Sequence, residues 1–151
     1  MGESNGFSSG RHNLKHQRTL QRRGLKVSHS FDKDSIEFYA EKKREKFIIE
    51  GIWETEPPDP KKITYAVGKT VKRMKERGFW IYYGIAIPKS YYRYLSEFEV
   101  TGFETLGLHL FLVESFYEVS HLDPKMATEL MKDVKTGNIT DEQVWSINYG
   151  L

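Results

Sequence analysis

The chain has 151 residues, of which 38% are hydrophobic and 29% charged, and a formal net charge of +2 at pH 7. This length fits one domain and is sufficient to bury a core. The absence of cysteine excludes disulfides and thiolate zinc sites, and the apolar runs are far shorter than a membrane span. We therefore expect a soluble, cytoplasmic protein with no signal peptide and no membrane partner.

The small net charge hides a strong separation of charge along the chain. Residues 1–28 carry a net charge of +5 and residues 61–77 carry +6, whereas residues 29–60 carry −4 and residues 97–151 carry −7. Two concentrated basic segments favour an anionic partner, and nucleic acid is the expected one.

The N-terminal segment divides into an arm and a short helix. Residues 1–10 are rich in Gly, Ser and Asn and have almost no large apolar side chains, so they are expected to form a flexible arm. Residues 11–23 lack Pro and Gly and end at Gly24, which is typical of a helix that stops there.

The next segment is rich in β-branched and aromatic residues, which is typical of strands. The sequences LKVSHSF (25–31), SIEFYA (35–40) and KFIIEGIW (46–53) predict three consecutive strands. The charged stretch EKKREK between the last two indicates a solvated hairpin turn, so these two strands should be antiparallel neighbours.

Helical periodicity is clearest over residues 61–77. The apolar face of this predicted helix consists of Ile63, Ala66, Val67, Thr70, Val71 and Met74. The apolar run 79–88 then predicts a buried strand, and a helical turn (89–96) and a loop around Thr101 and Gly102 should follow it. A further strand is expected at 106–113, where His109 is interpreted as a core residue. Two helices near 124–135 and 140–148 end the chain, the second capped by Thr140.

The resulting order of elements resembles the core of the PD-(D/E)XK, or restriction-endonuclease-like, nuclease superfamily over residues 11–113. The segments that carry the resemblance read KDSIEF, FIIEGIW, TYAVGKTVKRMKERG and IYYGIAIP. It implies an α/β fold with a mixed sheet of about five strands flanked by helices, in the order αβββαβαβ. Residues 11–151 would then form a single nuclease-like domain, with a helical extension over residues 114–151.

The resemblance also implies a metal site. The family's metal-binding Asp and Glu correspond to Asp34 and Glu50, which would hold Mg²⁺ or Mn²⁺ for hydrolysis of phosphodiester bonds. The family's lysine should stand two residues after Glu50, where this chain has Ile52. Either Lys69, on the predicted helix, or Lys46, at the start of the third strand, could supply the cation instead. Helical phase places Lys69 away from the apolar face, so its stem would have to reach around the helix.

Each acidic candidate has an alternative interpretation. Asp34 stands where a turn residue would hydrogen-bond the local backbone. Glu50 is harder to explain in this way, because strand alternation places it on one face with Ile48 and Ile52, where a carboxylate needs a partner. In addition, residues 11–23 contain no acid, although many relatives have one in the first helix.

Basic residues on the two predicted helices are candidates for phosphate contacts. They are Arg11, Lys15, Arg18, Arg22 and Arg23 on the first helix and Lys62, Lys69 and Arg73 on the second. The alternative is a solvated helix face, but Glu76 is the only acid in residues 61–77, so pairing within the helix cannot account for these charges.

Two hypotheses follow for the function. The first is a metal-dependent DNA nuclease in which Asp34, Glu50 and Lys69 are catalytic. The second is a non-catalytic DNA-binding or scaffold module on the same fold, as Ile52 suggests. Proteins of this family often act as dimers, so the resemblance also makes a homodimer an open expectation.

Overall fold

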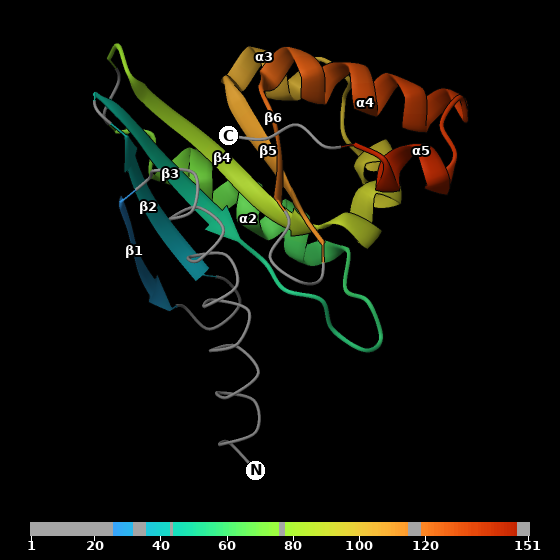
Figure 1. Cartoon of the computed structure of the whole chain (residues 1–151), viewed down its shortest axis with the longest axis horizontal. Helices are drawn as coiled ribbons and strands as arrows, with labels where there is room; N and C mark the ends of the chain where they lie inside the picture. Colours follow the sequence, from blue (N-terminus) through green and yellow to red (C-terminus); the bar gives the residue numbers. More distant parts are fainter. Residues whose placement is uncertain (1–25, 32–35, 43, 76–77, 115–118, 148–151) are drawn as a thin grey trace.

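The computed structural model describes residues 26–31, 36–42, 44–75, 78–114 and 119–147. In this part of the chain, six strands form one sheet in sequence order, with helices packed against it (Figure 1). The strands are β1 (Lys26–Phe31), β2 (Ile36–Lys42), β3 (Glu45–Gly51), β4 (Ile81–Pro88), β5 (Leu108–Val113) and β6 (Val119–Leu122). The expected α/β class, with a mixed sheet flanked by helices, is confirmed. The predicted arm and first helix lie outside the described residues.

Strand directions follow from the connections. β1, β2 and β3 form an antiparallel meander, β3, β4 and β5 are parallel, and β6 is antiparallel to β5. The predicted hairpin is confirmed, because β2 and β3 pair from Ile36 opposite Gly51 to Lys42 opposite Glu45. Helix α2 (Lys61–Lys72) connects the parallel strands β3 and β4, as a parallel pair requires.

The main core lies between one face of the sheet and the helices that cover it. The remaining helices are the 3-10 helix η1 (Lys89–Glu97), α3 (Gly102–Leu106), α4 (Pro124–Thr136) and α5 (Asp141–Trp145). Buried residues of α2 and α4 share one apolar cluster with alternate residues of β3, β4 and β5, including Ile48, Ile85 and Leu110. A smaller cluster around Phe47, Ile49 and Phe111 lies on the other face. No helix in the described ranges is long and apolar enough to cross a membrane.

The C-terminal segment differs from its predicted form. β6 lies inside the segment 114–151 that was expected to be helical, and it raises the strand count from about five to six. Its four residues, VSHL, are too few for a reliable alternation pattern. They form a strand because they pair with β5, from Leu110 opposite Leu122 to Val113 opposite Val119. This pairing is not visible in the local sequence.

Several element boundaries also differ. β4 begins at Ile81 rather than at residue 79, because Trp80 has a left-handed backbone (φ 76°) and Phe79 is 93% exposed. Helix α2 ends at Lys72, five residues earlier than predicted. Gly102, which was expected to lie in a loop, is the first residue of α3. This helix ends at Leu106, before Gly107, whose φ of 67° is left-handed.

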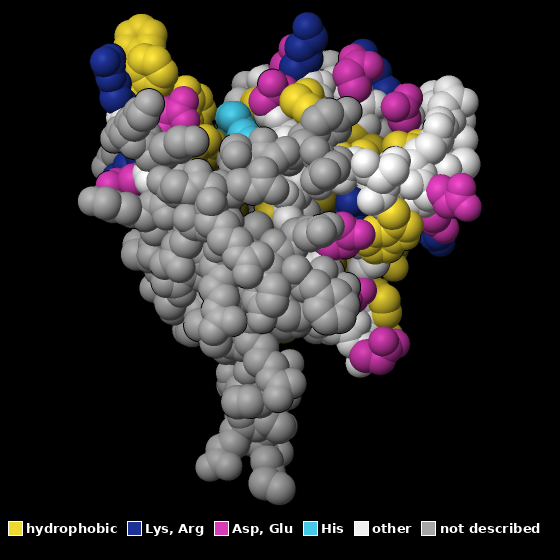
Figure 2. Space-filling view, in the orientation of Figure 1, with side chains coloured by type: hydrophobic (Ala, Val, Ile, Leu, Met, Phe, Trp, Pro, Cys, Tyr) yellow, Lys and Arg dark blue, Asp and Glu magenta, His cyan; other side chains and the backbone are white. Residues whose placement is uncertain are grey.

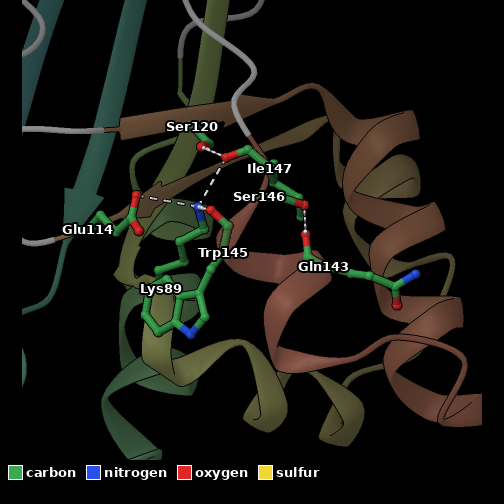
Figure 3. A network of polar contacts seen from close by, with 7 residues as sticks. All are labelled: Lys89, Glu114, Ser120, Gln143, Trp145, Ser146 and Ile147. Carbon is green, nitrogen blue, oxygen red and sulfur yellow. Dashed lines mark hydrogen bonds and ion pairs between the residues drawn. The ribbon is translucent and has the colours of Figure 1, made fainter.

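A buried lysine ties α5 to the end of β4 (Figure 3). Lys89 is 1% exposed, and its Nζ donates to the carbonyl oxygens of Trp145 (3.2 Å) and Ile147 (3.0 Å). It also lies 3.5 Å from a carboxylate oxygen of Glu114, and the Ser120 hydroxyl donates to the Ile147 carbonyl. These contacts satisfy a charge that would be costly to bury alone. The predicted cap of this helix by Thr140 is confirmed, as part of a capping box with Gln143.

Gly84 in β4 allows a test of the packing between the central strands. A Cβ at this position would lie 2.8 Å from the carbonyl oxygen of His109 and 2.9 Å from a ring carbon of Phe111. We expect Gly84→Ala to lower the free energy of unfolding by about 2 kcal/mol in urea denaturation, because the neighbouring strand must shift. Gly68→Ala is the control, since α2 has open space there and helix propensity favours alanine. Equal effects of the two substitutions would contradict this packing.

Candidate functional site

The site is built around Glu50, in the middle of β3. Its backbone is opposite Glu37 of β2 and Ile85 of β4, so it lies in the interior of the sheet. Glu50 is completely buried, and its neighbours on the same face, Ile48 and Ile52, belong to the main core. The predicted strand parity is confirmed. A buried carboxylate at this position needs compensating charge, because its desolvation costs several kcal/mol.

Lys69 of α2 and Arg73, the C-cap residue of this helix, supply that charge. Arg73 Nη1 donates a hydrogen bond to Glu50 Oε1, and Lys69 Nζ lies 3.8 Å from Glu50 Oε2. Because Lys69 and Arg73 are four residues apart, they lie one helical turn from each other and reach the same carboxylate. Both side chains are only about one-sixth exposed (16% and 17%), so water screens the three charges weakly. The cluster has a formal charge of +1.

Aromatic rings flank both cations. The Arg73 guanidinium carbon lies 5.1 Å from the ring centroid of Tyr39 in β2, and Lys69 Nζ lies 5.6 Å from that of Tyr65 in α2. Cation–π contacts at this distance hold the positive groups in place and replace part of their hydration.

Lys69 reaches Glu50 although its phase predicted a position away from the apolar face. The buried residues of α2 are Ile63, Ala66 and Thr70. Lys69 flanks this stripe, and its four-carbon stem extends toward the carboxylate. Arg73 continues the stripe, three residues after Thr70. Its role beside Glu50 was missed, because it was grouped with the phosphate-binding cations, although the spacing 63, 66, 70, 73 could have indicated it.

The expected metal site is only partly covered by the structure. Asp34 lies outside the described residues. Ile52, where the resemblance would place a lysine, is 0% exposed and packs in the main core. Among the described residues, no three His, Asp or Glu side chains group as metal ligands would. In this arrangement one oxygen of Glu50 accepts a hydrogen bond from Arg73, and the other lies 3.8 Å from Lys69 Nζ.

The basic residues predicted to contact phosphate are in different situations. Arg11, Lys15, Arg18, Arg22 and Arg23 lie outside the described residues. Lys62 is half-buried, and its Nζ lies 4.9 Å from the ring centroid of Trp53. Lys61, Lys72 and Lys75 are exposed, as is Tyr65 at 44%. The outer side of α2 therefore presents lysines and an aromatic ring to solvent.

A pair of histidines lies on the opposite face of the sheet. His109 in β5 is buried, as expected for a core residue, and its Nδ1 lies 2.7 Å from Nε2 of His121 in β6. One ring nitrogen donates to the other, and the stacked rings contact Phe47 and Phe111. Burial lowers the pKa of each histidine to about 4, so the folded protein keeps both rings neutral.

No protein-family model, curated protein or solved structure matches this chain.

The ion-pair cluster is tested by a double-mutant cycle. We expect Arg73→Met to lower the free energy of unfolding by about 3 kcal/mol, because it removes the cation that hydrogen-bonds the buried carboxylate of Glu50. Glu50→Gln should cost less, and the double variant should cost less than the sum of the two, because each substitution removes the same interaction. Arg93→Met is the control: it removes an exposed arginine paired with Asp141 and should have a much smaller effect. Strict additivity would show that Glu50 and Arg73 do not interact.

The histidine pair predicts a defined pH dependence of stability. The unfolded chain binds protons at these positions near pH 6.5, whereas the folded protein does so only near pH 4. Stability should therefore be full above pH 6.5 and fall as the pH is lowered through this window, by on the order of 2 kcal/mol per histidine. In urea denaturation between pH 7 and 4, His121→Gln should lose about half of this dependence. An unchanged slope would rule the pair out as its cause.

Proposed function

We propose that the protein binds nucleic acid, with DNA as the expected partner, through the outer face of α2, on a nuclease-like fold that does not hydrolyse its ligand. The observation that carries the proposal is the charge of this helix. The sequence of α2, KKITYAVGKTVK, contains four lysines and no acid. Pairing within the helix cannot neutralise these lysines, and Glu50 compensates only Lys69, so an external polyanion is the natural partner of the others.

The ion pairs of Glu50 with Lys69 and Arg73 favour binding without hydrolysis. A carboxylate that binds a divalent cation must offer its oxygens to the metal. The Glu50 oxygens instead face Arg73 and Lys69 inside the core, and Ile52 fills the position of the family's lysine. In this arrangement Glu50 positions α2 on the sheet, and the exposed lysines and Tyr65 remain available for phosphates and bases.

Hydrolysis is the second candidate, and one observation favours it. Lys69 Nζ lies 3.8 Å from Glu50 Oε2, so a lysine stands beside the acid even though the motif lysine is missing. Metal-dependent cleavage with Asp34, Glu50 and Lys69 would require Arg73 to release the carboxylate.

The binding proposal is tested by the salt dependence of affinity. We expect Lys61→Gln/Lys62→Gln to reduce the slope of log K against log salt by about 2, because each lost phosphate contact removes about 0.9. The affinity at each salt concentration is measured by fluorescence anisotropy with a labelled duplex and a labelled single strand. The control, Lys125→Gln/Lys135→Gln, makes the same change in net charge at exposed positions of α4. Equal slopes for both variants would contradict binding by α2.

Cleavage assays decide between the two candidates. With Mg²⁺ or Mn²⁺ and a panel of single-stranded, duplex and branched DNA, we expect retention of DNA without products. Glu50→Gln should leave binding by the exposed lysines largely intact wherever the variant is folded. Metal-dependent products that disappear in both Glu50→Gln and Lys69→Gln would instead establish the nuclease.

A further inference from the structure

Two consecutive aromatic side chains protrude where β4 begins. Phe79 is 93% exposed and Trp80 is 45% exposed, and both lie in the turn that follows Gly78. Figure 2 shows protruding hydrophobic side chains beside basic ones at this end of the sheet. Neither ring belongs to one of the two apolar clusters of the described residues, so packing in the core does not account for them. Adjacent exposed apolar side chains of this size mark a contact surface.

The backbone holds the two rings in their exposed position. Trp80 has a left-handed conformation (φ 76°), which is rare and unfavourable for a bulky side chain. Two hydrogen bonds fix the turn: the backbone N–H of Ile81 donates to the carbonyl of Gly78 (3.5 Å), and that of Lys46 donates to the carbonyl of Trp80 (2.7 Å). Such conformations concentrate at functional sites, and a fixed turn lowers the entropic cost of a contact with a ligand.

Cations lie close to the two rings. The guanidinium carbon of Arg44 lies 5.9 Å from the ring centroid of Trp80. Lys72, the last residue of α2, and Lys75 are both exposed. Lys75 precedes Phe79 by four residues, a length of chain that spans at most about 14 Å. The lysine surface of α2 therefore extends to the neighbourhood of the rings.

The hairpin beside the rings also contains acids. Glu41 is exposed and Glu45 is partly exposed, so the charge at this end of the sheet is mixed. Mixed charge does not favour a cluster of phosphates on the rings themselves. A nucleic acid would instead contact the rings through the flat faces of its bases, while its phosphates contact the lysines of α2.

We propose that Phe79 and Trp80 stack on unpaired bases of a single strand whose phosphates contact α2. This proposal rests on the nucleic-acid binding proposed above and adds the preferred form of the ligand, a single strand rather than a duplex. Surfaces that bind single strands combine cations along the backbone with aromatic rings for the bases, and arginine adds cation–π contacts. The lysines of α2, the two rings and Arg44 provide these three components. Bases within a duplex already stack on their neighbours and are not free to stack on protruding rings.

The test separates stacking from phosphate contacts by their salt dependence. Phosphate contacts set the slope of log K against log salt, whereas stacking changes the affinity by a constant factor. In fluorescence anisotropy on the full chain, we expect Phe79→Ala to weaken binding of a labelled single strand of about 12 nucleotides by about tenfold at every salt concentration, with an unchanged slope. The affinity for a duplex of the same sequence should change by less than about twofold.

Two further substitutions give the controls. Trp80→Ala should weaken binding of the single strand as Phe79→Ala does, and Trp80→Phe should retain it, because a phenyl ring also stacks on a base. Trp145→Ala is the matched control, since Trp145 is also 45% exposed and lies in α5, on the other side of the molecule (Figure 1). It should alter the affinity by less than about twofold. Phe79→Ala should leave the stability unchanged, because almost the whole ring is already in solvent.

An unchanged affinity in Phe79→Ala, or an equal loss for single strand and duplex, would overturn the proposal. It would also be overturned if Phe79→Ala reduced only binding to vesicles of anionic lipid, or only self-association in sedimentation, because the rings would then contact a membrane or a second copy of the chain. Lys61→Gln/Lys62→Gln tests binding by α2 separately. A lower slope in that variant with no effect of Phe79→Ala would contradict stacking alone, whereas a tenfold loss in Phe79→Ala with equal slopes for the lysine variants would support stacking and contradict binding by α2.

Discussion

The carboxylate of Glu50, fully buried in the middle of β3, is the constraint on which the arrangement of α2 depends. A charge in the core must be compensated within a few ångströms, and α2 provides Lys69 and Arg73 one helical turn apart. The helix therefore has one favourable position along the strand. Its apolar residues Ile63 and Ala66 bury the same face at that position, so electrostatics and packing specify the same arrangement.

The same constraint divides the cations of α2 into two groups. Lys69 and Arg73 compensate Glu50 inside the protein, whereas Lys61, Lys72 and Lys75 are exposed to solvent. This division explains how a helix without acids can be stable against the sheet and still present a surplus of positive charge. Ile52, two residues after Glu50, is fully buried and belongs to the main core.

The sequence correctly predicted the elements that are determined by neighbouring residues. The charged turn between two apolar segments predicted the β2–β3 hairpin, and helical periodicity predicted α2, although not its end. Strand alternation also identified Glu50 as an acid on an apolar face. The features that were missed depend on distant partners. β6 is a strand only through β5, His109 meets His121 across that pairing, and the role of Arg73 required knowing which strand its helix covers.

The central claim is that Arg73 and Lys69 compensate the carboxylate of Glu50, which therefore does not bind a divalent cation. This claim is tested most directly by NMR of the labelled protein with substoichiometric Mn²⁺. Bound Mn²⁺ broadens the signals of nearby nuclei. The account predicts that the backbone amide signals of Ile49, Glu50 and Gly51 keep their widths in the wild-type protein. Selective broadening centred on Glu50 would contradict the claim and would show that the Glu50 carboxylate binds a divalent cation.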